Sequence, residues 1–532
     1  MKTILKRKTF AISFLILISG SLLCGCGSGK ENKKDTAVTE SVAKLETGIM
    51  NKDPLLEAWP DTAYASAADV KFKIERLDSI SGELTLLDDL YSGAPGVFTF
   101  RGGEHRDADY GGSVDSVPTG FQVEWVFQTA QDNNETRFGT WRGGTGWTGQ
   151  PLYVEWPDSV LERFKASGMT ASRREILIGS LCGEVYSLDY DTGRPTRAAI
   201  PTGNPIKGTM SLDPTLNGNL YVGQGVPSQS EISALTISLF KNCITHSFGP
   251  DAKAPRYWHA YDSSAIRVGR FLFRPGENGT LYKWLIEGDK PILHSAVRYS
   301  VGGASPGMEA SMAVSRNYGY IADNGGNIIC FNLNTLQPVW HYKLPDDIDS
   351  TPVLCEESGK IFLYTGCEVE HPGVTNARYV KLDALTGNEI WINEIPAKRA
   401  DVGSKHFDGG YYASTLPGRG DCKDLLFINV VNNEKRQNGS FIAIERTTGK
   451  IRYTVPLKYY AWSSPVGFMV SGEHQLVVTF DCAGRGYIIN GVDGEVIAEQ
   501  RIGANFESSP VVNGHSLVIG SRGDKIYRLS LR

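Results

Sequence analysis

Short segments in which apolar and polar residues alternate follow one another from about residue 121 to the C-terminus. In the last unit, three such segments at 508–512, 516–521 and 525–529 are separated by short turns. A period of two and an enrichment in β-branched and aromatic residues are typical of β-strands. The pattern therefore predicts an all-β domain over residues 121–532.

The strands repeat along the chain in units of four. The first strand of a unit carries a Ser-Pro-Val motif, as at 464–466, or Thr-Pro-Val, as at 351–353. A turn with Thr-Gly precedes the fourth strand, as at 386–387 and 448–449, and its glycine provides the positive φ that a hairpin turn requires. Four-stranded units that start about 40 to 60 residues apart are typical of β-propeller blades.

The repeats predict a propeller of eight blades. Seven blades is the alternative, in which the second and third units form one blade with a long insertion. The last unit ends after three strands, whereas Phe121–Phe127 has the pattern of a fourth strand and no partner before it. We expect this N-terminal strand to complete the last blade, because closure hides two sheet edges. The first strands are expected to start near residues 150, 209, 263, 311, 351, 413, 464 and 509.

The first 25 residues have the pattern of a bacterial lipoprotein signal peptide. A basic start is followed by an apolar run at about 9–19 that is too short to span a membrane. Cys26 follows in an arrangement similar to the lipobox and is the predicted lipidation site, whereas Cys24 fits less well because Leu precedes it. The alternative is an ordinary secretory signal with two incidental cysteines. Residues 26–50 predict a flexible tether, and residues 51–120 an N-terminal extension and entry segment.

These features predict an exported protein, anchored to the extracytoplasmic face of a membrane through acylated Cys26, with the lipid bilayer as a partner. The formal net charge of −5 argues against nucleic-acid binding, which needs a basic surface. The chain has no P-loop, no His-Glu-x-x-His and no Gly-x-Ser-x-Gly motif. The seven cysteines after Cys26 have no metal-site spacing, so we expect free thiols; a pair between Cys355 and Cys367, which flank one predicted hairpin, is the alternative.

Residues 98–532 resemble the PQQ-type repeats of quinoproteins. Thr365-Gly366, Leu382–Gly387 and Ile390-Trp391 match the repeat motif best, and Phe98–Gly103 looks like the entry segment of such propellers. The resemblance implies the propeller fold and is weak for function. WD40 blades match less well, because no Trp-Asp pair ends a blade.

The resemblance leads to two branches of this superfamily. Quinoprotein dehydrogenases hold PQQ and calcium at the propeller centre, under a disulfide between adjacent cysteines. This chain has no adjacent cysteines, and its tryptophans do not show the regular docking pattern of those enzymes. We therefore expect no PQQ, while calcium stays open. The second branch is the lipid-anchored, eight-bladed scaffold protein of the outer-membrane β-barrel assembly machinery, which matches the predicted anchor.

Polar and aromatic residues just before the first strands are expected to meet at the mouth of the central funnel. A cation or a sugar can use such carboxylates and aromatic faces, whereas a hydrated channel mouth without a ligand is the alternative. The metal, if any, is not identified by the pattern. Gly102–Asp109 clusters ligand-type residues without metal spacing, and we interpret it as a solvated loop. The candidate funnel residues are Arg142, Trp147, Asp262, Glu309, Asp349, Tyr411, Trp462 and Glu507, with Lys207, His259 and Tyr412 beside them.

The sequence thus predicts a non-catalytic binding or scaffolding module of the cell envelope, with an envelope protein or a cell-wall glycan as its partner. The alternative is an enzyme, either a quinoprotein-like oxidoreductase or a hydrolase that uses the funnel carboxylates. The sequence does not decide whether the chain is an enzyme, but the lack of a catalytic motif favours a non-catalytic role.

Overall fold

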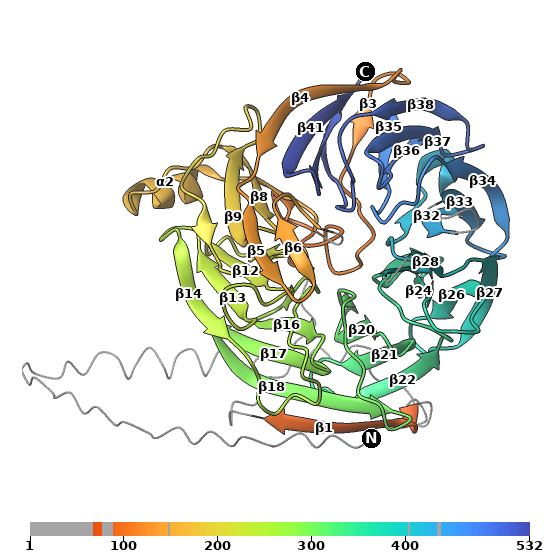
Figure 1. Cartoon of the computed structure of the whole chain (residues 1–532), viewed down its shortest axis with the longest axis horizontal. Coiled ribbons are helices and arrows are strands. Elements are labelled where there is room, and N and C mark those ends of the chain that lie inside the picture. The colour runs from red at the N-terminus through yellow and green to blue at the C-terminus, as the bar shows by residue number, and fades with distance from the viewer. Residues whose placement is uncertain (1–66, 77–88, 147–148, 403–404, 433–437) are drawn as a thin grey trace, which may run out of the picture. The chain divides into compact units, whose positions relative to one another are not determined.

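The computed structural model describes residues 67–76, 89–146, 149–402, 405–432 and 438–532. Eight sheets stand around a central axis within these ranges (Figure 1). The predicted all-β propeller of eight blades is confirmed. The seven-bladed alternative is wrong, because the second and third repeat units form separate sheets. The predicted signal peptide, the tether, Cys26 and Trp147 lie outside the described residues.

Each blade runs from an inner strand to an outer strand. The first four blades consist of β7 (Leu152–Glu155), β8 (Arg174–Gly179), β9 (Glu184–Asp189) and β10 (Ile200–Pro201); β11 (Ser211–Leu212), β12 (Asn219–Gly223), β13 (Ala234–Ser238) and β14 (Cys243–Phe248); β15 (Ile266–Val268), β16 (Phe271–Gly276), β17 (Thr280–Glu287) and β18 (Lys290–Val301); β19 (Ala313–Ser315), β20 (Tyr318–Ala322), β21 (Asn327–Asn332) and β22 (Pro338–Lys343).

The fifth to eighth blades follow the same order, except that the last strand of the eighth blade comes from the N-terminal part of the chain. They consist of β23 (Val353–Glu357), β24 (Lys360–Gly366), β26 (Asn376–Asp383) and β27 (Glu389–Pro396); β31 (Leu416–Pro417), β32 (Leu425–Val431), β33 (Gly439–Glu445) and β34 (Ile451–Leu457); β35 (Val466–Val470), β36 (His474–Phe480), β37 (Arg485–Asn490) and β38 (Val496–Arg501); β39 (Val511–Asn513), β40 (Ser516–Ser521), β41 (Lys525–Leu531) and β4 (Phe121–Gln128).

Further short strands and helices lie outside the four-stranded blades. The strand β1 covers the outer edge of the third blade by pairing along β18. None of the helices in the described ranges is long and apolar enough to cross a membrane. These elements are β1 (Val70–Arg76), β2 (Gly96–Val97), β3 (Ser113–Val114), β5 (Asp132–Thr136), β6 (Gly139–Arg142), α2 (Asp158–Ala166), β25 (Glu368–Val369), β28 (Ala400–Val402), β29 (Lys405–Phe407), β30 (Gly409–Gly410) and the short 3₁₀-helix Gly420–Cys422.

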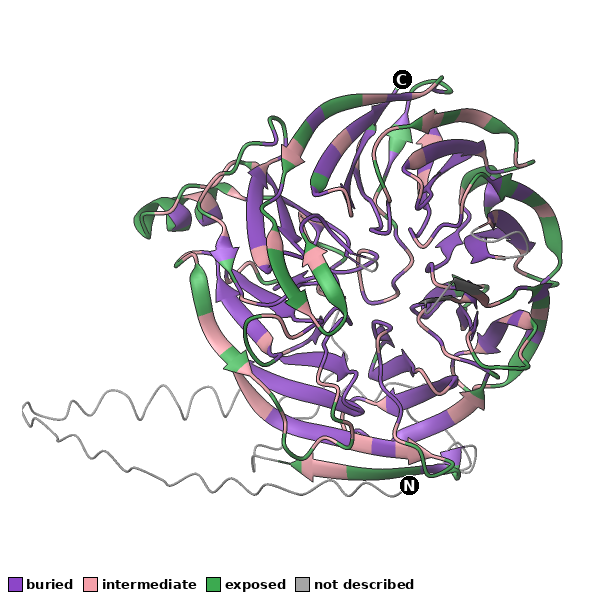
Figure 2. Cartoon of the chain, viewed as in Figure 1, coloured by how far each residue is buried: buried purple, intermediate pink, exposed green. Residues whose placement is uncertain are grey.

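Apolar side chains from facing sheets fill the spaces between neighbouring blades. Buried residues dominate the inner strands, whereas outer strands such as β34 and β38 are largely exposed or half-buried (Figure 2). This gradient follows from the architecture, because each inner strand is covered on both faces and the outermost strand meets water at the rim.

The Ser-Pro-Val motif has a structural role at the inner end of the blades. Its hydroxyl accepts a hydrogen bond from the backbone of the preceding blade. Ser464 Oγ accepts from the N–H of Ser414 at 2.9 Å, and Ser509 Oγ accepts from the N–H of Ser464 at 3.0 Å. Thr351 Oγ1 does the same for the N–H of Ser311 at 3.0 Å. The motif therefore links successive blades through groups that would otherwise be buried without partners.

Aromatic residues of the outer strands dock onto the next blade. Trp340 Nε1 donates to the carbonyl of Ala384 at 3.0 Å, and Trp391 Nε1 donates to that of Arg446 at 2.8 Å. The indole of Trp340 also covers the turn glycine Gly387, where an added Cβ would lie 2.6 Å from the ring. Tryptophans therefore dock onto the next blade at these junctions, whereas Tyr453 covers the corresponding glycine, Gly494, at the junction between the sixth and seventh blades. The docking position is thus used in several blades but is not always a tryptophan.

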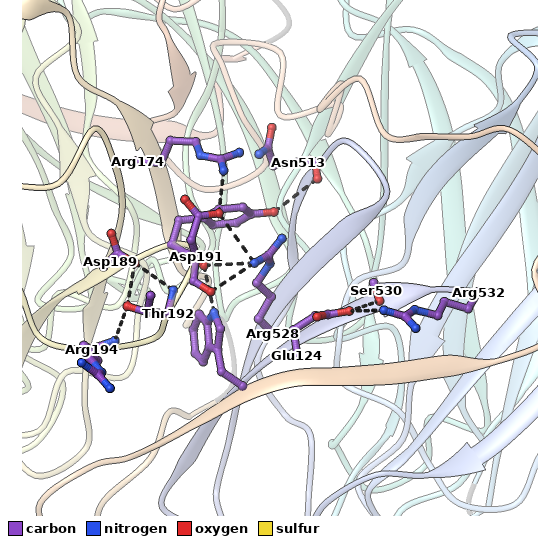
Figure 3. A network of polar contacts seen from close by, with 12 residues as sticks. Glu124, Arg174, Asp189, Asp191, Thr192, Arg194, Asn513, Arg528, Ser530 and Arg532 are labelled. Atoms are coloured by element: carbon purple, nitrogen blue, oxygen red, sulfur yellow. Dashed lines mark hydrogen bonds and ion pairs between the residues drawn. The ribbon is translucent and has the colours of Figure 1, made fainter.

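The junction between the eighth and first blades is built in the same way. The N-terminal strand β4 pairs antiparallel with β41, from Phe121 opposite Leu531 to Gln128 opposite Lys525. Trp125 Nε1 donates to the carbonyl of Tyr190 in the first blade at 2.8 Å. Polar contacts surround this junction: Arg174 and Arg528 reach Asp191, and Glu124 pairs with Ser530 and Arg532 (Figure 3).

Residues 96–114 cross the centre of the ring and form a central plug. This segment begins at β2, which pairs with the first blade, and ends at β3, which pairs with the seventh. Between them its carbonyl groups accept backbone hydrogen bonds from the second, fourth and fifth blades, and the N–H of Ser113 donates to Gly514 of the eighth. The segment winds inside the ring in Figure 1.

Two buried arginines anchor the plug. Arg101 donates to the carbonyls of Thr415 at 2.6 Å and Pro465 at 2.8 Å, in the sixth and seventh blades. Arg106 donates to the carbonyl of Met312 at 2.9 Å. Both side chains are fully buried. The interpretation of Gly102–Asp109 as a solvated loop is therefore wrong at its centre, because Arg106 is buried and donates to distant carbonyls, while Asp107 and Asp109 pair with Arg419.

Candidate functional site

A cavity of about 480 Å³ opens at the centre of the ring, on the side where the chain enters the first strands. Its walls come from the loops before the inner strands of several blades and from β25. Seven carboxylate residues and two basic residues contribute, together with four aromatic residues. The lining consists of Trp141, Gly146, Lys207, Glu309, Asp347, Asp349, Glu368, Glu370, Phe407, Asp408, Tyr412, Trp462, Glu507 and Arg522.

Four of the candidate residues, Glu309, Asp349, Trp462 and Glu507, line this cavity, and so do Lys207 and Tyr412 beside them. Two others lie elsewhere. The side chain of Arg142 is 57% exposed and lies 3.8 Å from Asp524. Tyr411 is fully buried in a blade core against Tyr379, because neighbouring residues of an extended chain point to opposite sides.

Asp347, Glu368, Glu370, Asp408 and Arg522 reach the cavity without having been predicted. Asp347 belongs to the acidic run at 346–349, a signal that could have been read from the sequence. Glu368 lies on β25, which departs from the four-strand repeat and pairs with β30 of the sixth blade. The repeat pattern therefore could not predict that Glu368 reaches the funnel.

The carboxyl groups of Asp347, Asp349 and Glu368 have pKa values well above their usual range. Burial is the main cause, and the negative charges of their neighbours add to it. Asp349 and Glu368 also hydrogen-bond to each other, which requires a proton on one of the two. The funnel therefore favours any species that removes negative charge, either a proton or a bound cation.

A second group of carboxylates surrounds Lys207. Asp262, Glu277 and Glu309 have oxygen atoms within 4.8 Å of one another. Lys207 forms an ion pair with Asp262. Burial alone lowers the pKa of this lysine, but the three carboxylates raise it above its usual value. Glu277 accepts a hydrogen bond from Trp258 at 2.6 Å through one oxygen, while its other oxygen is buried without a partner.

A third acidic group is accounted for by its own hydrogen bonds. Asp346, Glu370 and His371 also lie within 4.8 Å of one another. One oxygen of Asp346 accepts from the backbone N–H groups of Glu370 and His371, both at 2.9 Å, and the other contacts the ring of His371. This arrangement holds a turn together without a ligand.

The aromatic wall of the funnel is preorganised. The rings of Tyr412 and Trp462 are stacked, with their centroids 5.2 Å apart and their planes inclined by 28°. Such a flat face beside carboxylates suits an organic cation, since the ring quadrupole attracts positive charge.

Comparisons with known proteins place this geometry in context. No protein-family model and no curated protein sequence matches the chain. The structure of quinohemoprotein alcohol dehydrogenase from Pseudomonas putida HK5 superimposes with a TM-score of 0.58 at 12% identity, over 85% of this chain and 83% of the enzyme. The quinohemoprotein alcohol dehydrogenase from Comamonas testosteroni has a TM-score of 0.56 at 11% identity, over 84% and 82% of the two chains.

The chain has the fold of quinohemoprotein alcohol dehydrogenases. The predicted resemblance to quinoprotein-type propellers is thereby confirmed for the fold. BamB from Moraxella catarrhalis is a further structural neighbour, with a TM-score of 0.47 at 15% identity, over 68% of this chain and 96% of BamB. At these identities the likeness extends to the propeller and not to its chemistry.

The funnel does not fit the cofactor PQQ. PQQ carries three carboxylates, and the funnel lining has seven carboxyl groups against Lys207 and Arg522. A trianion placed there would face groups of its own sign, which is strongly unfavourable in a partly desolvated site. A hard cation such as Ca²⁺ fits better, because carboxylate oxygens are its preferred ligands.

Proposed function

We propose that this chain is a membrane-anchored, extracytoplasmic binding module that holds a cationic ligand in its acidic funnel. The propeller acts as a non-catalytic receptor or scaffold of the cell envelope, and acylated Cys26 attaches it to the bilayer. The signal pattern at residues 1–25 supports export, and the acidic lining supports the choice of ligand.

The proposal rests mainly on the carboxylate of Glu368. The residue is only 4% exposed, lines the funnel, and has one carboxylate oxygen without a hydrogen-bond partner. A buried carboxylate in this state is costly unless a proton or a cation compensates it. Asp349 lies against it and has the same requirement.

The ligand is expected to be a cation that carboxylates can coordinate, either Ca²⁺ or an organic ammonium group that also contacts Tyr412 and Trp462. The cavity of about 480 Å³ has the size of sites for small molecules. An amino sugar of the cell wall or a basic side chain of an envelope protein presents such a group.

Thermal unfolding at about pH 8 tests this function with CaCl₂, MgCl₂, spermidine and glucosamine, each at matched ionic strength. At least one of these cations should raise the Tm of the wild-type chain and lose its effect in the variants Glu368→Gln and Asp349→Asn. Glu155→Gln, at an exposed position of the first blade, is the matched control and should respond like the wild type. No response to any cation, or an equal response in the two funnel variants, would refute the proposal.

A further inference from the structure

A second, smaller cavity of about 130 Å³ lies between the second and third blades, away from the funnel. Strands β12, β13 and β14 form one wall, and β16, β17 and β18 form the opposite wall. The side chains that face it are cross-strand neighbours, such as Thr236 opposite His246 in the second blade and Leu272 opposite Trp284 in the third.

Arg274 of β16 lines this cavity and is only 2% exposed. Its Nη1 atom is buried without a hydrogen-bond partner, and no ion pair joins Arg274 to a carboxylate within the described ranges. Other buried arginines differ in this respect. Arg267, in the neighbouring strand, pairs with Asp213, and Arg106 donates to carbonyls of the plug and of the fourth blade.

Arg274 remains cationic at neutral pH. Burial lowers its pKa to about 10, against the opposing effects of Tyr261 and Asp262. Asp262 cannot serve as its full counter-charge, because it forms an ion pair with Lys207. A buried guanidinium that lacks an anion and retains open donor positions is unfavourable, and an arginine fork matches a carboxylate in geometry.

The other residues that line the cavity indicate which chemical group is attached to the anionic head of the ligand. Trp284 and Phe248 meet edge to face at 5.5 Å, and Leu272 and Leu293 complete an apolar surface. The Nδ1 atom of His246 is a further buried polar atom without a partner. A cavity of this volume is close to the roughly 150 Å³ that accommodates benzene in a protein core. The occupant therefore has one anionic head and a short apolar tail.

We propose that this interblade cavity binds a small monocarboxylate, whose carboxylate pairs with Arg274 and whose tail lies against Trp284 and Phe248. The site is independent of the funnel, since it uses other residues and the opposite charge. Short-chain and aromatic monocarboxylates such as butyrate and benzoate have the required head, tail and size.

The experiment compares thermal unfolding and titration calorimetry of the full chain with butyrate, benzoate, butyramide and chloride at matched ionic strength. Butyrate or benzoate should raise the Tm of the wild type, whereas butyramide and chloride should not. In Arg274→Met the Tm rise should vanish and the Kd should weaken by about tenfold or more. Ala234→Leu, which fills the cavity and leaves the arginine in place, should have the same effect.

Arg452→Met, at an exposed position of the sixth blade, is the matched control and should bind like the wild type. Because Arg274→Met removes an unpaired charge and keeps most of the side-chain volume, it should fold without a ligand. A carboxylate effect that persists in Arg274→Met, an equal effect of chloride, or no effect of either carboxylate would each overturn the proposal. None of these outcomes bears on the cation site of the funnel.

Discussion

Trp125 donates its indole hydrogen to the carbonyl oxygen of Tyr190, at a distance of 2.8 Å, and so joins the last blade of the ring to the first. The same bond links Trp391 to Arg446 between two blades that are consecutive in sequence. The difference lies within the eighth blade, because no loop joins β41 to β4, whereas a turn joins the third and fourth strands of the other blades. The closing blade therefore depends on the pairing of β4 with β41 and on side-chain packing, without the covalent turn that the other blades have.

Replacing Trp125 with alanine should destabilise the protein by about 3–5 kcal/mol, the usual range for a buried tryptophan. Urea unfolding measures the change. Val126→Ala on the same strand is the control, because Val126 is 47% exposed and should matter little. Limited proteolysis should cut the Trp125→Ala chain near β4 earlier than the wild type. A variant as stable and as resistant as the wild type would show that β4 does not hold the ring closed.

The acidic funnel should make stability depend on pH in a defined direction. Asp347, Asp349 and Glu368 have pKa values raised in the folded state, so the folded protein holds more protons than the unfolded chain. Their contribution is therefore complete below the unfolded pKa of about 4 and is lost as pH rises through the higher folded values. Between about pH 5 and pH 8, the Tm of the wild type should fall more steeply than that of Glu368→Gln. Equal slopes in the two proteins would contradict the raised pKa values.

A cation should act in the opposite sense. If it replaces the shared protons, calcium or spermidine should raise the Tm at about pH 8 and have little effect at about pH 5, where protons already neutralise the site. Thermal unfolding at both pH values measures this. A cation effect of the same size at both would place the bound cation away from these carboxyl groups.

Much of the ring could be predicted from sequence, and the funnel only in part. The repeat located the first strands well, as at residue 464 for β35, which begins at Val466. Repetition also brought Glu309 and Asp349 to one axis. It failed for Glu368, because β25 lies outside the repeat, and for Tyr411, because side-chain direction changes with every residue of an extended segment. The buried state of Arg106 could not be predicted, since Ser264 and Met312, which accept from it across the ring, are far away in sequence.

The plug should be as important for stability as a blade core. Replacing Arg106 with methionine leaves the carbonyls of Phe100 and Met312 buried without this donor, at an expected cost on the order of 3–5 kcal/mol. Chemical unfolding measures the loss. Arg142→Met removes an exposed arginine near the funnel and should cost little. A negligible effect of Arg106→Met would mean that the plug is only loosely attached.

PQQ should not bind in the funnel. Equilibrium dialysis with PQQ and calcium, followed by a dye-linked alcohol assay, should give neither retention of the quinone nor turnover. The physical reason is the excess of carboxyl groups around Glu309 and Glu507. Stoichiometric binding with turnover would instead favour an oxidoreductase.

Cys26→Ser should abolish membrane attachment. If Cys26 is the acylated residue, the variant will accumulate as an unprocessed precursor or appear in the medium, because it lacks the acyl chains that hold the protein in the bilayer. Fractionation and metabolic labelling with palmitate measure this. Cys24→Ser is the matched control and should remain acylated. Normal labelling of the Cys26→Ser protein would refute the assignment.

The plug also has a consequence for the order of folding. Arg101 and its partner Pro465 are 364 positions apart, and the eighth blade is complete only when β4 pairs with β41. Contacts of such long range are entropically expensive and form slowly. We therefore expect a slow final phase of folding in which the central plug and the eighth blade become ordered together, once β41 is available to pair with β4. Until then the chain presents open strand edges, and it is in this interval that it depends most on chaperones and is most exposed to proteases.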